Sequence, residues 1–195
     1  MIRMASQKDA AEIAALLWEI FEDMELSLLE KIPKNKLLEM VAEAVAEPVY
    51  RYGFTRGIVY EINGEIAGVS FGYPSVDEPF IDEPFRNVLL KNGYNENEKL
   101  FVDKEAFPDE WYLDSIVVNQ KYRGLGIGSA LLGEMDQMAL KAGYNTIGLN
   151  VDIANPNAKK LYSSIGYKKV AEIVLSGHRY EHLCKTLTDT HTKVK

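Results

Sequence analysis

The apolar side chains near the start of the chain recur at intervals of three and four residues, the spacing of one helix face. The first set comprises Ile13, Leu16, Leu17, Ile20, Phe21 and Met24. It predicts a helix that follows a capping-box segment at 6–9 and runs to about Leu29. Pro33 opens a second predicted helix, which continues to Val45. A short apolar strand over 2–5 precedes both helices.

Two apolar runs over 57–62 and 65–72 indicate β-strands. Asn63-Gly64 stands between them and predicts a tight hairpin, because a type I′ turn needs positive φ at both central residues. Later in the chain the pattern predicts strands over 111–118, 145–151, 167–175 and 178–187, and helices over 126–142 and 155–165. This order of strands and helices predicts an α/β (α+β) fold, with a mixed sheet and helices on both of its faces.

The segment 74–109 interrupts this regular pattern. It contains four prolines and more acidic than basic residues, and a short helix around 85–91 is the one regular element we expect there. The 195 residues suffice for one domain with a substantial core but are few for two. We therefore predict a single domain over 1–188, with 74–109 as an irregular acidic insertion, followed by a polar tail over 189–195.

Charge is distributed unevenly along the chain. The net charge is −7, which argues against a nucleic-acid partner. Residues 1–110 carry 22 acidic and 11 basic side chains, whereas residues 111–195 carry 7 acidic and 11 basic ones. This distribution favours an anionic ligand on the C-terminal half and a cationic one near the N-terminal half. The alternative is that the acidic side chains merely solvate helix faces.

Membrane insertion and disulfides have no support in the sequence. No apolar run approaches the roughly 20 residues that a membrane-spanning helix needs, and the N-terminus lacks the apolar core of a secretory signal. The one cysteine, Cys184, cannot form an internal disulfide. A cytoplasmic location with no membrane partner is the expectation.

A glycine-rich loop joins a predicted strand to a predicted helix. Its glycines are Gly124, Gly126 and Gly128. Glycines at a helix N-terminus let phosphate oxygens approach unpaired amides without interference from a Cβ. A nucleotide P-loop would need a lysine before Ser129, and a dinucleotide fingerprint would need a glycine at Ser129 or Leu131.

The pattern Arg/Gln-x-x-Gly-x-Gly/Ala is met instead, by Arg123, Gly126 and Gly128. The run 118–128 is similar to the pyrophosphate loop of the GCN5-related N-acetyltransferase (GNAT) family. A second motif over 155–167 resembles the later motif of that family, with an Asn, an Ala three residues on, a Tyr seven residues on and a closing Gly-aromatic pair. The resemblance covers most of the chain except the acidic insertion, which is longer than the usual connection in the family.

The resemblance implies a mostly antiparallel central sheet and an acetyl-CoA-dependent N-acetyltransferase. Such an enzyme transfers an acetyl group from acetyl-CoA, its co-substrate, to a primary amine that attacks the thioester directly, with no metal. The residues expected to hold the co-substrate are Ile116, Val117, Val118, Arg123, Gly124, Leu125, Gly126, Ile127, Gly128, Ser129, Asn155 and Lys159. Family members often pair through edge strands, so a homodimer is one assembly that the resemblance allows. The acceptor and the preferred acyl chain length stay open.

Amide formation from a thioester needs an acid, a base and a donor to the developing oxyanion. The resemblance places the Val118 amide at the thioester oxygen. Tyr162 lies two helical turns beyond Asn155 and is the expected general acid. Glu110 and Asp114 share one face of the strand that leads into the loop, and either is a candidate base. The alternatives are an aromatic packed under the sheet for Tyr162, a helix cap for Asn155 and solvated charges for the carboxylates.

Two rival interpretations deserve comparison. The run 178–182, His-Arg-Tyr-Glu-His, matches a zinc-hydrolase signature, but that chemistry needs a helix and this run is predicted to be a strand. Only His191 remains as a third histidine ligand, so we expect no metal site. A non-catalytic acyl-CoA-binding module would keep the loop and lose the acid and base. The acceptor is expected to be cationic and to contact residues 74–109, because long loops often carry specificity.

Overall fold

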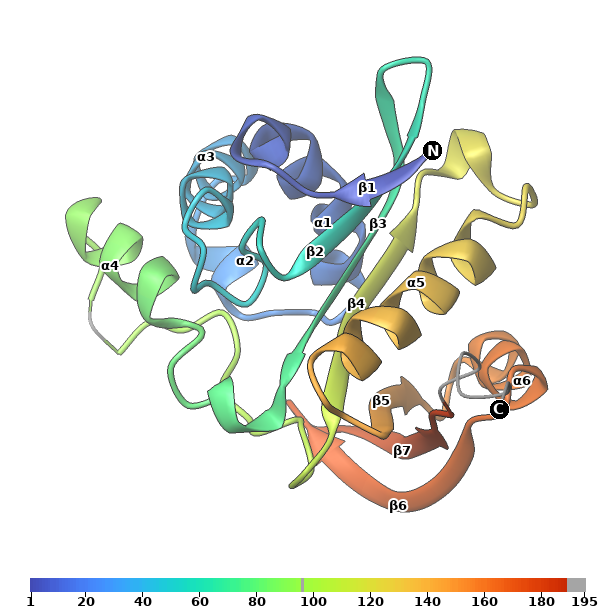
Figure 1. Cartoon of the computed structure of the whole chain (residues 1–195). Helices are drawn as coiled ribbons and strands as arrows, with labels where there is room; N and C mark the ends of the chain where they lie inside the picture. Colours follow the sequence, from blue (N-terminus) through green and yellow to red (C-terminus); the bar gives the residue numbers. More distant parts are fainter. Residues whose placement is uncertain (96, 189–195) are drawn as a thin grey trace.

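Seven strands form one sheet in the computed structural model, which describes residues 1–95 and 97–188 (Figure 1). The strands are β1 Ile2–Met4, β2 Gly57–Ile62, β3 Glu65–Pro74, β4 Trp111–Val118, β5 Thr146–Asp152, β6 Lys168–Leu175 and β7 His178–Thr186. Their order across the sheet is β1-β2-β3-β4-β5-β7-β6. The β4–β5 pair is parallel and the other five pairs of this described sheet are antiparallel. The prediction of a mixed, mostly antiparallel sheet is therefore confirmed.

Helices cover both faces of the sheet, as predicted. They are α1 Ala10–Asp23, α2 Leu28–Lys31, α3 Lys34–Val45, α4 Glu83–Lys91, α5 Ile127–Lys141 and α6 Pro156–Ser164. Figure 1 shows α5 in front of β3 and β4, with α1 and α3 behind the sheet. The apolar core accordingly has two main parts, one on each face of the sheet. Val117 belongs to the part that includes α1 and α3, and Leu113 belongs to the part that includes α5.

One predicted helix boundary is wrong. The first long helix ends at Asp23 rather than near Leu29, because Glu25 adopts a left-handed φ of 50°. The turn carries Leu26 and Leu28 into the core, where they are 5% and 1% exposed. Burying these two side chains stabilises the fold more than extending the helix would. A straight helix could pack only one of its faces against the sheet.

The predicted hairpin is confirmed. Asn63 and Gly64 have φ angles of 52° and 85°, as a type I′ turn requires. The other strands and helices begin and end within about two residues of their predicted bounds, the usual uncertainty of assignment. The tail over 189–195 lies outside the described residues. Among the residues that the structure describes, no helix combines the length and apolar character needed to cross a bilayer.

The segment 74–109 is held by internal hydrogen bonds. It contains α4, which begins two residues earlier than predicted, and a 3₁₀ turn over Ser75–Asp77. Its end folds back because the Glu78 carboxylate accepts the backbone amides of Glu105 and Ala106, at 2.6 and 3.2 Å. Buried backbone amides need such partners. The insertion therefore fixes Glu105 against Tyr112 of β4.

Strands β4 and β5 separate soon after they start. Their pairing is limited to Trp111 with Ile147 and Tyr112 with Gly148. A bulge in β4 follows, since Gly72 and Phe71 of β3 pair with residues 113 and 115 and leave Asp114 without an opposite residue. Beyond this point the edge of β4 that faces β5 has no strand partner in the described sheet, and a wedge opens between the two strands.

Candidate active site

The wedge between β4 and β5 holds a cavity of about 160 Å³. Its walls are formed by Ile20, Leu113, Asp114, Ser115, Ile116, Leu149, Asn150 and Tyr162. These side chains come from α1, β4, β5 and α6, so elements from both halves of the chain meet there. Polar groups that converge in a cleft beside apolar side chains are typical of a small-molecule site.

A second cavity of about 310 Å³ lies at the glycine loop. Its lining consists of Val118, Tyr122, Arg123, Gly124, Gly126, Ile127, Gly128, Ser129 and Leu161. Leu125 belongs to the same loop and is 66% exposed. Since α6 contributes Leu161 to this cavity and Tyr162 to the wedge, the two cavities are neighbours along α6 and β4.

The loop requires glycine for its backbone conformation. Gly124 and Gly126 have φ angles of 80° and 76°, and Gly126 is the N-cap of α5. A Cβ added at either position would meet no atom within 4 Å, so packing does not exclude a side chain there. A side chain at Gly126 would instead strain the left-handed backbone. The first amides of α5 thus face the cavity without obstruction, as an anion site needs.

The free edge of β4 offers backbone donors between the two cavities. The Asn119 amide donates to the Ala67 carbonyl of β3, at 3.0 Å. Amide directions alternate along a strand, so the Val118 amide points the other way, towards the unpaired side. The side chain of Val117 is buried in the core, whereas Ile116 and Val118 line the cavities.

The remaining residues expected to hold the co-substrate have intramolecular partners. Arg123 donates to the Val118 carbonyl at 3.1 Å and pairs with Glu19 of α1 at 2.8 Å. The Oδ1 atom of Asn155 accepts the Ala158 amide at 3.0 Å and caps α6, which was the alternative role considered for it. Lys159 pairs with Glu181 of β7 at 2.5 Å. Neither Asn155 nor Lys159 lines the two cavities.

Tyr162 is a protonated phenol beside the wedge. Its ring packs edge-on against Tyr167, with centroids 5.7 Å apart. Burial raises the pKa of Tyr162 to about 12. The hydroxyl therefore keeps its proton at neutral pH, which a proton donor must do. The same packing also fits the alternative of a structural aromatic.

Glu110 and Asp114 have different partners. The Asp114 carboxylate lines the wedge and accepts from Arg51 at 2.6 Å and from the Tyr73 hydroxyl at 3.2 Å. The Glu110 side chain is 2% exposed and lines no part of the wedge. Its carboxylate contacts His182 at 3.0 Å. The two candidate bases are thus not brought together, and only Asp114 borders the cavity.

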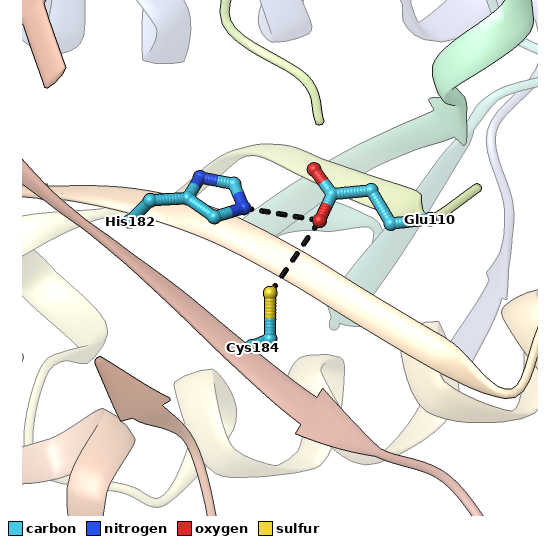
Figure 2. Close-up of side chains that lie close together, drawn as sticks. All are labelled: Glu110, His182 and Cys184. Carbon is cyan, nitrogen blue, oxygen red and sulfur yellow. Dashed lines mark hydrogen bonds and ion pairs between the residues drawn. The ribbon is translucent and has the colours of Figure 1, made fainter. Parts of the chain in front are cut away.

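Figure 2 shows one carboxylate oxygen of Glu110 contacted by both His182 and Cys184. One oxygen, one nitrogen and one sulfur of these side chains lie within 4.8 Å of one another, and these are atom types that bind zinc. Hydrogen bonds also account for the cluster: the Cys184 thiol donates to Glu110 at 3.5 Å. Burial and, to a lesser extent, the negative charge of Glu110 raise the pKa of Cys184 to about 12. The thiolate form, which is the one that binds metals, is therefore disfavoured. The expectation of no metal stays a prediction.

The tautomer of His182 follows from its neighbours. The Nδ2 group of Asn150 donates to the backbone carbonyl of Glu105, at 3.1 Å, and a carbonyl can only accept. The Oδ1 atom of Asn150 therefore faces His182 Nδ1 at 2.6 Å, and this nitrogen must carry a proton. His182 Nε2 lies 3.0 Å from the Glu110 carboxylate. The pair holds Asn150, which lines the wedge, in one orientation.

Sequence reasoning missed a buried charge cluster next to the wedge. Arg51 is 1% exposed and pairs with Asp82, Glu105 and Asp114, at 3.0, 2.8 and 2.6 Å. Its guanidinium also lies 4.1 Å from the centroid of the Phe101 ring. The only signal in the sequence was the excess of acidic residues over 74–109, which identifies neither the arginine nor its partners.

The zinc-hydrolase interpretation of 178–182 is not supported by the backbone. The run lies on strand β7, as predicted. His178 stands at the turn, 3.7 Å from the Glu25 carboxylate, whereas His182 is fully buried. A helix would be needed to present both histidines to one ion. His191 lies outside the described residues.

Comparison with known proteins gives concordant matches. The profile of the Acetyltransferase (GNAT) family matches residues 13–167. The crystal structure of an acetyltransferase is 46% identical, with a TM-score of 0.89 and coverage of 96% of this chain and 100% of that one. The N-acetyltransferase from Staphylococcus aureus Mu50 is 30% identical, with a TM-score of 0.83 and coverage of 94% and 99%. An N-alpha-acetyltransferase from Sulfurisphaera tokodaii is 29% identical over 154 residues, 78% of this chain and 74% of the relative.

Proposed function

The chain belongs to the Acetyltransferase (GNAT) family, and on that premise we propose that it transfers the acetyl group of acetyl-CoA to a primary amine inside the β4–β5 wedge. The observation that carries this proposal is the alignment of two cavities along the free edge of β4. One cavity has a helix N-terminus and glycines for a pyrophosphate, and the other has a phenol and a carboxylate for chemistry. An elongated thioester fits such a pair of sites.

The co-substrate is held along β4. The pyrophosphate binds the amides of the loop over 123–129, and the pantetheine arm follows the backbone of 116–118. The Val118 amide donates to the thioester oxygen as it becomes an oxyanion. Asn155 can contribute although it caps α6, because the cap uses only its oxygen. Lys159 adds positive charge nearby, in competition with its ion pair to Glu181.

The reaction needs no further activation of the acyl group, since a thioester supplies it. The amine nitrogen attacks the carbonyl carbon, a C–N bond forms and the C–S bond breaks. Tyr162 donates its phenolic proton to the departing thiolate. Asp114 lies in the wedge and attracts the cationic amine, and Glu110 acts at a distance by fixing His182 and Asn150.

The acceptor is a cationic amine that approaches from the side of the 74–109 insertion. Three carboxylates surround one arginine at the border of the wedge, so the cluster has a surplus of negative charge. Such a surplus attracts an ammonium group. The name of the Sulfurisphaera tokodaii relative makes a peptide N-terminal amine the first acceptor to test, beside polyamines.

A panel of amines with thiol release as the readout tests this choice. Polyamines and peptides with a free N-terminus should be acetylated with a KM that rises with salt, because salt screens the attraction. Comparable turnover of neutral arylamines, with no effect of salt on KM, contradicts a cationic acceptor. Binding of acetyl-CoA without turnover of any amine favours the non-catalytic module instead.

A homodimer is the proposed assembly. β6 is an edge strand of the sheet, and it exposes Val170 and Val174, at 57% and 61%. Edge strands with exposed apolar side chains commonly pair with another chain. The molar mass in solution tests this: a monomer at micromolar concentration contradicts the proposal.

A further inference from the structure

Glu105 belongs to the insertion and occupies a fixed and buried position beside the start of β4. Its side chain is 10% exposed. Its amide donates to the Glu78 carboxylate at 2.6 Å, and its carbonyl accepts from Asn150 at 3.1 Å. Both backbone anchors are hydrogen bonds to side chains, so the carboxylate is placed by the fold of the insertion against β5 and not by a regular element of its own.

Two oriented donors hold the Glu105 carboxylate. Arg51 Nη1 donates to Oε1 at 2.8 Å, and the Tyr112 hydroxyl donates to Oε2 at 3.0 Å. The direction of the Tyr112 hydroxyl is settled by Asn150, whose Nδ2 group donates to the same phenolic oxygen at 3.0 Å. The phenolic proton must then point at Glu105. The carboxylate is thus aligned by groups that also line or border the wedge.

Hydrogen bonds from Arg51 and Tyr112 connect Glu105 to the border of the wedge, although Glu105 itself does not line it. Arg51 Nη1 donates both to Glu105 and to Asp114, and Asp114 lines the wedge. On its other side Glu105 lines a small cavity with Met24, Phe101, Val102, Asp103, Leu175 and Ser176. Glu105 therefore lies between the Arg51–Asp114 pair at the wedge and the surface formed by the insertion and the β6–β7 turn.

Glu105 can exchange a proton near neutral pH. Burial raises its pKa to about 7; the Asp114 charge acts in the same direction, and Arg51 opposes both. The titratable and charged groups that face Glu105 or Arg51 include the carboxylates of Glu78, Asp82 and Asp114 and the phenols of Tyr50, Tyr52, Tyr73, Tyr112 and Tyr180. Burial raises the pKa of Glu78 and of all five tyrosines, so the phenols stay neutral where Glu105 titrates.

We propose that Glu105 is the general base of the acetyl transfer and takes the proton of the acceptor ammonium through a bridging water, since its carboxylate lies beside the wedge without lining it. This inference rests on the proposed function. The ammonium gives one proton to the Glu105 carboxylate, which later releases it to solvent. The neutral amine then attacks the thioester. Tyr162 protonates the leaving sulfur and regains a proton from the nitrogen of the new amide, so that protons balance.

The test compares acceptors of different basicity. Glu105→Gln should lower kcat/KM at least about tenfold for an alkylamine that is an ammonium at pH 7, since general bases contribute roughly 10²–10⁴-fold. The decrease in kcat/KM should be smaller for a weakly basic amine, such as trifluoroethylamine, because this amine is already neutral at pH 7. Affinity for CoA, measured by calorimetry, should stay unchanged. Glu98→Gln is the matched control, because Glu98 lies in the same segment, pairs with Lys31 and should leave all three values unchanged.

A second variant covers the case in which Glu105→Gln fails to fold. The hydrogen bond from Tyr112 lowers the pKa of Glu105. Tyr112→Phe removes it, so the rise of kcat/KM with pH, expected near pH 7 in the parent, should move to higher pH. If Glu105 had only a structural role, the rise of kcat/KM with pH would occur at the same pH as in the parent. Two results would overturn the role of Glu105 while leaving the proposed function standing. One is a parent-like kcat/KM of Glu105→Gln for both amines, and the other is a parent-like pH dependence of kcat/KM in Tyr112→Phe. Absence of acetyl transfer by the parent overturns the proposed function and, with it, this one.

Discussion

At the residue scale, the function of Tyr162 can be separated from its packing. Tyr162→Phe removes one oxygen and keeps the ring that contacts Tyr167. Affinity for acetyl-CoA should change little, while kcat falls by at least about tenfold, the cautious end of what a general acid contributes. Single-turnover kinetics should be used, so that slow product release does not hide the effect.

Tyr167→Phe is the matched control. The Tyr167 hydroxyl is buried and has no hydrogen-bond partner among the residues that the structure describes. Its removal should leave kcat and stability at least as high as in the parent, because a buried unpaired polar group is costly. An unchanged single-turnover rate in Tyr162→Phe would contradict the acid role, and loss of folding there would favour the packing alternative.

The glycine loop gives a second prediction at this scale. Gly126→Val should abolish or strongly weaken CoA binding, because the side chain enters the cavity and a β-branched residue disfavours a φ of 76°. Calorimetric titration with CoA measures the effect. Gly133→Ala is the control, because this glycine is exposed on α5 with no neighbour within 4 Å of an added Cβ, and binding should be retained. Parent-like affinity in Gly126→Val would place the pyrophosphate elsewhere.

Individual residues also show which parts of the site could be predicted from the sequence and which could not. Glycine spacing predicted the loop because the requirement for positive φ is local. The partners of Arg51 could not be predicted, since Glu105 and Asp114 are 54 and 63 residues away in sequence. Which charges meet across a fold depends on the path of an irregular segment, and no period in the sequence encodes that path.

At the element scale, the junction of β4 and β5 depends on one glycine. An added Cβ at Gly148 would lie 2.1 Å from the Glu110 carboxylate oxygen. That carboxylate cannot move away cheaply, because the Phe107 amide and His182 hold it, at 2.8 and 3.0 Å. Gly148→Ala should therefore lower the free energy of unfolding by about 1–3 kcal/mol, the usual cost of overpacking a core.

Denaturant unfolding measures this change. Gly133→Ala is again the control and should raise the free energy of unfolding by about 0.5–1 kcal/mol, as expected for a helical glycine. If Gly148→Ala were as stable as the parent, Glu110 would not be fixed in the position described, and its proposed action through His182 would lose its basis.

Elements also differ in how well pattern predicted them. The hairpin at 63–64 and the strand β4 were found because turn chemistry and alternation are local signals. The early end of α1 was missed, since Glu25 takes a left-handed conformation without a glycine to indicate it. The bulge at Asp114 and the separation of β4 from β5 arise from pairing between strands, which periodicity along one strand cannot reveal.

At the scale of the whole molecule, we predict acetyl transfer without a metal. Glu110, His182 and Cys184 have the atom types of a zinc site, yet hydrogen bonds join them and the thiol is held protonated. Dialysis against a strong chelator should leave kcat and the unfolding midpoint unchanged. Loss of activity that zinc restores would contradict this, and zinc content measured in the purified protein would then identify the cluster as a site.

The most direct measurement is the stoichiometry of acetyl transfer. Purified protein is incubated with acetyl-CoA and a cationic amine, and free CoA and acetylated amine are quantified over time, with Tyr162→Phe in parallel. The proposal predicts acceptor-dependent release of CoA, matched mole for mole by the acetylated amine, and a slower rate for the variant. Release of CoA without acetylated amine, or tight binding of acetyl-CoA with no amine-dependent release from any cationic acceptor, would contradict it.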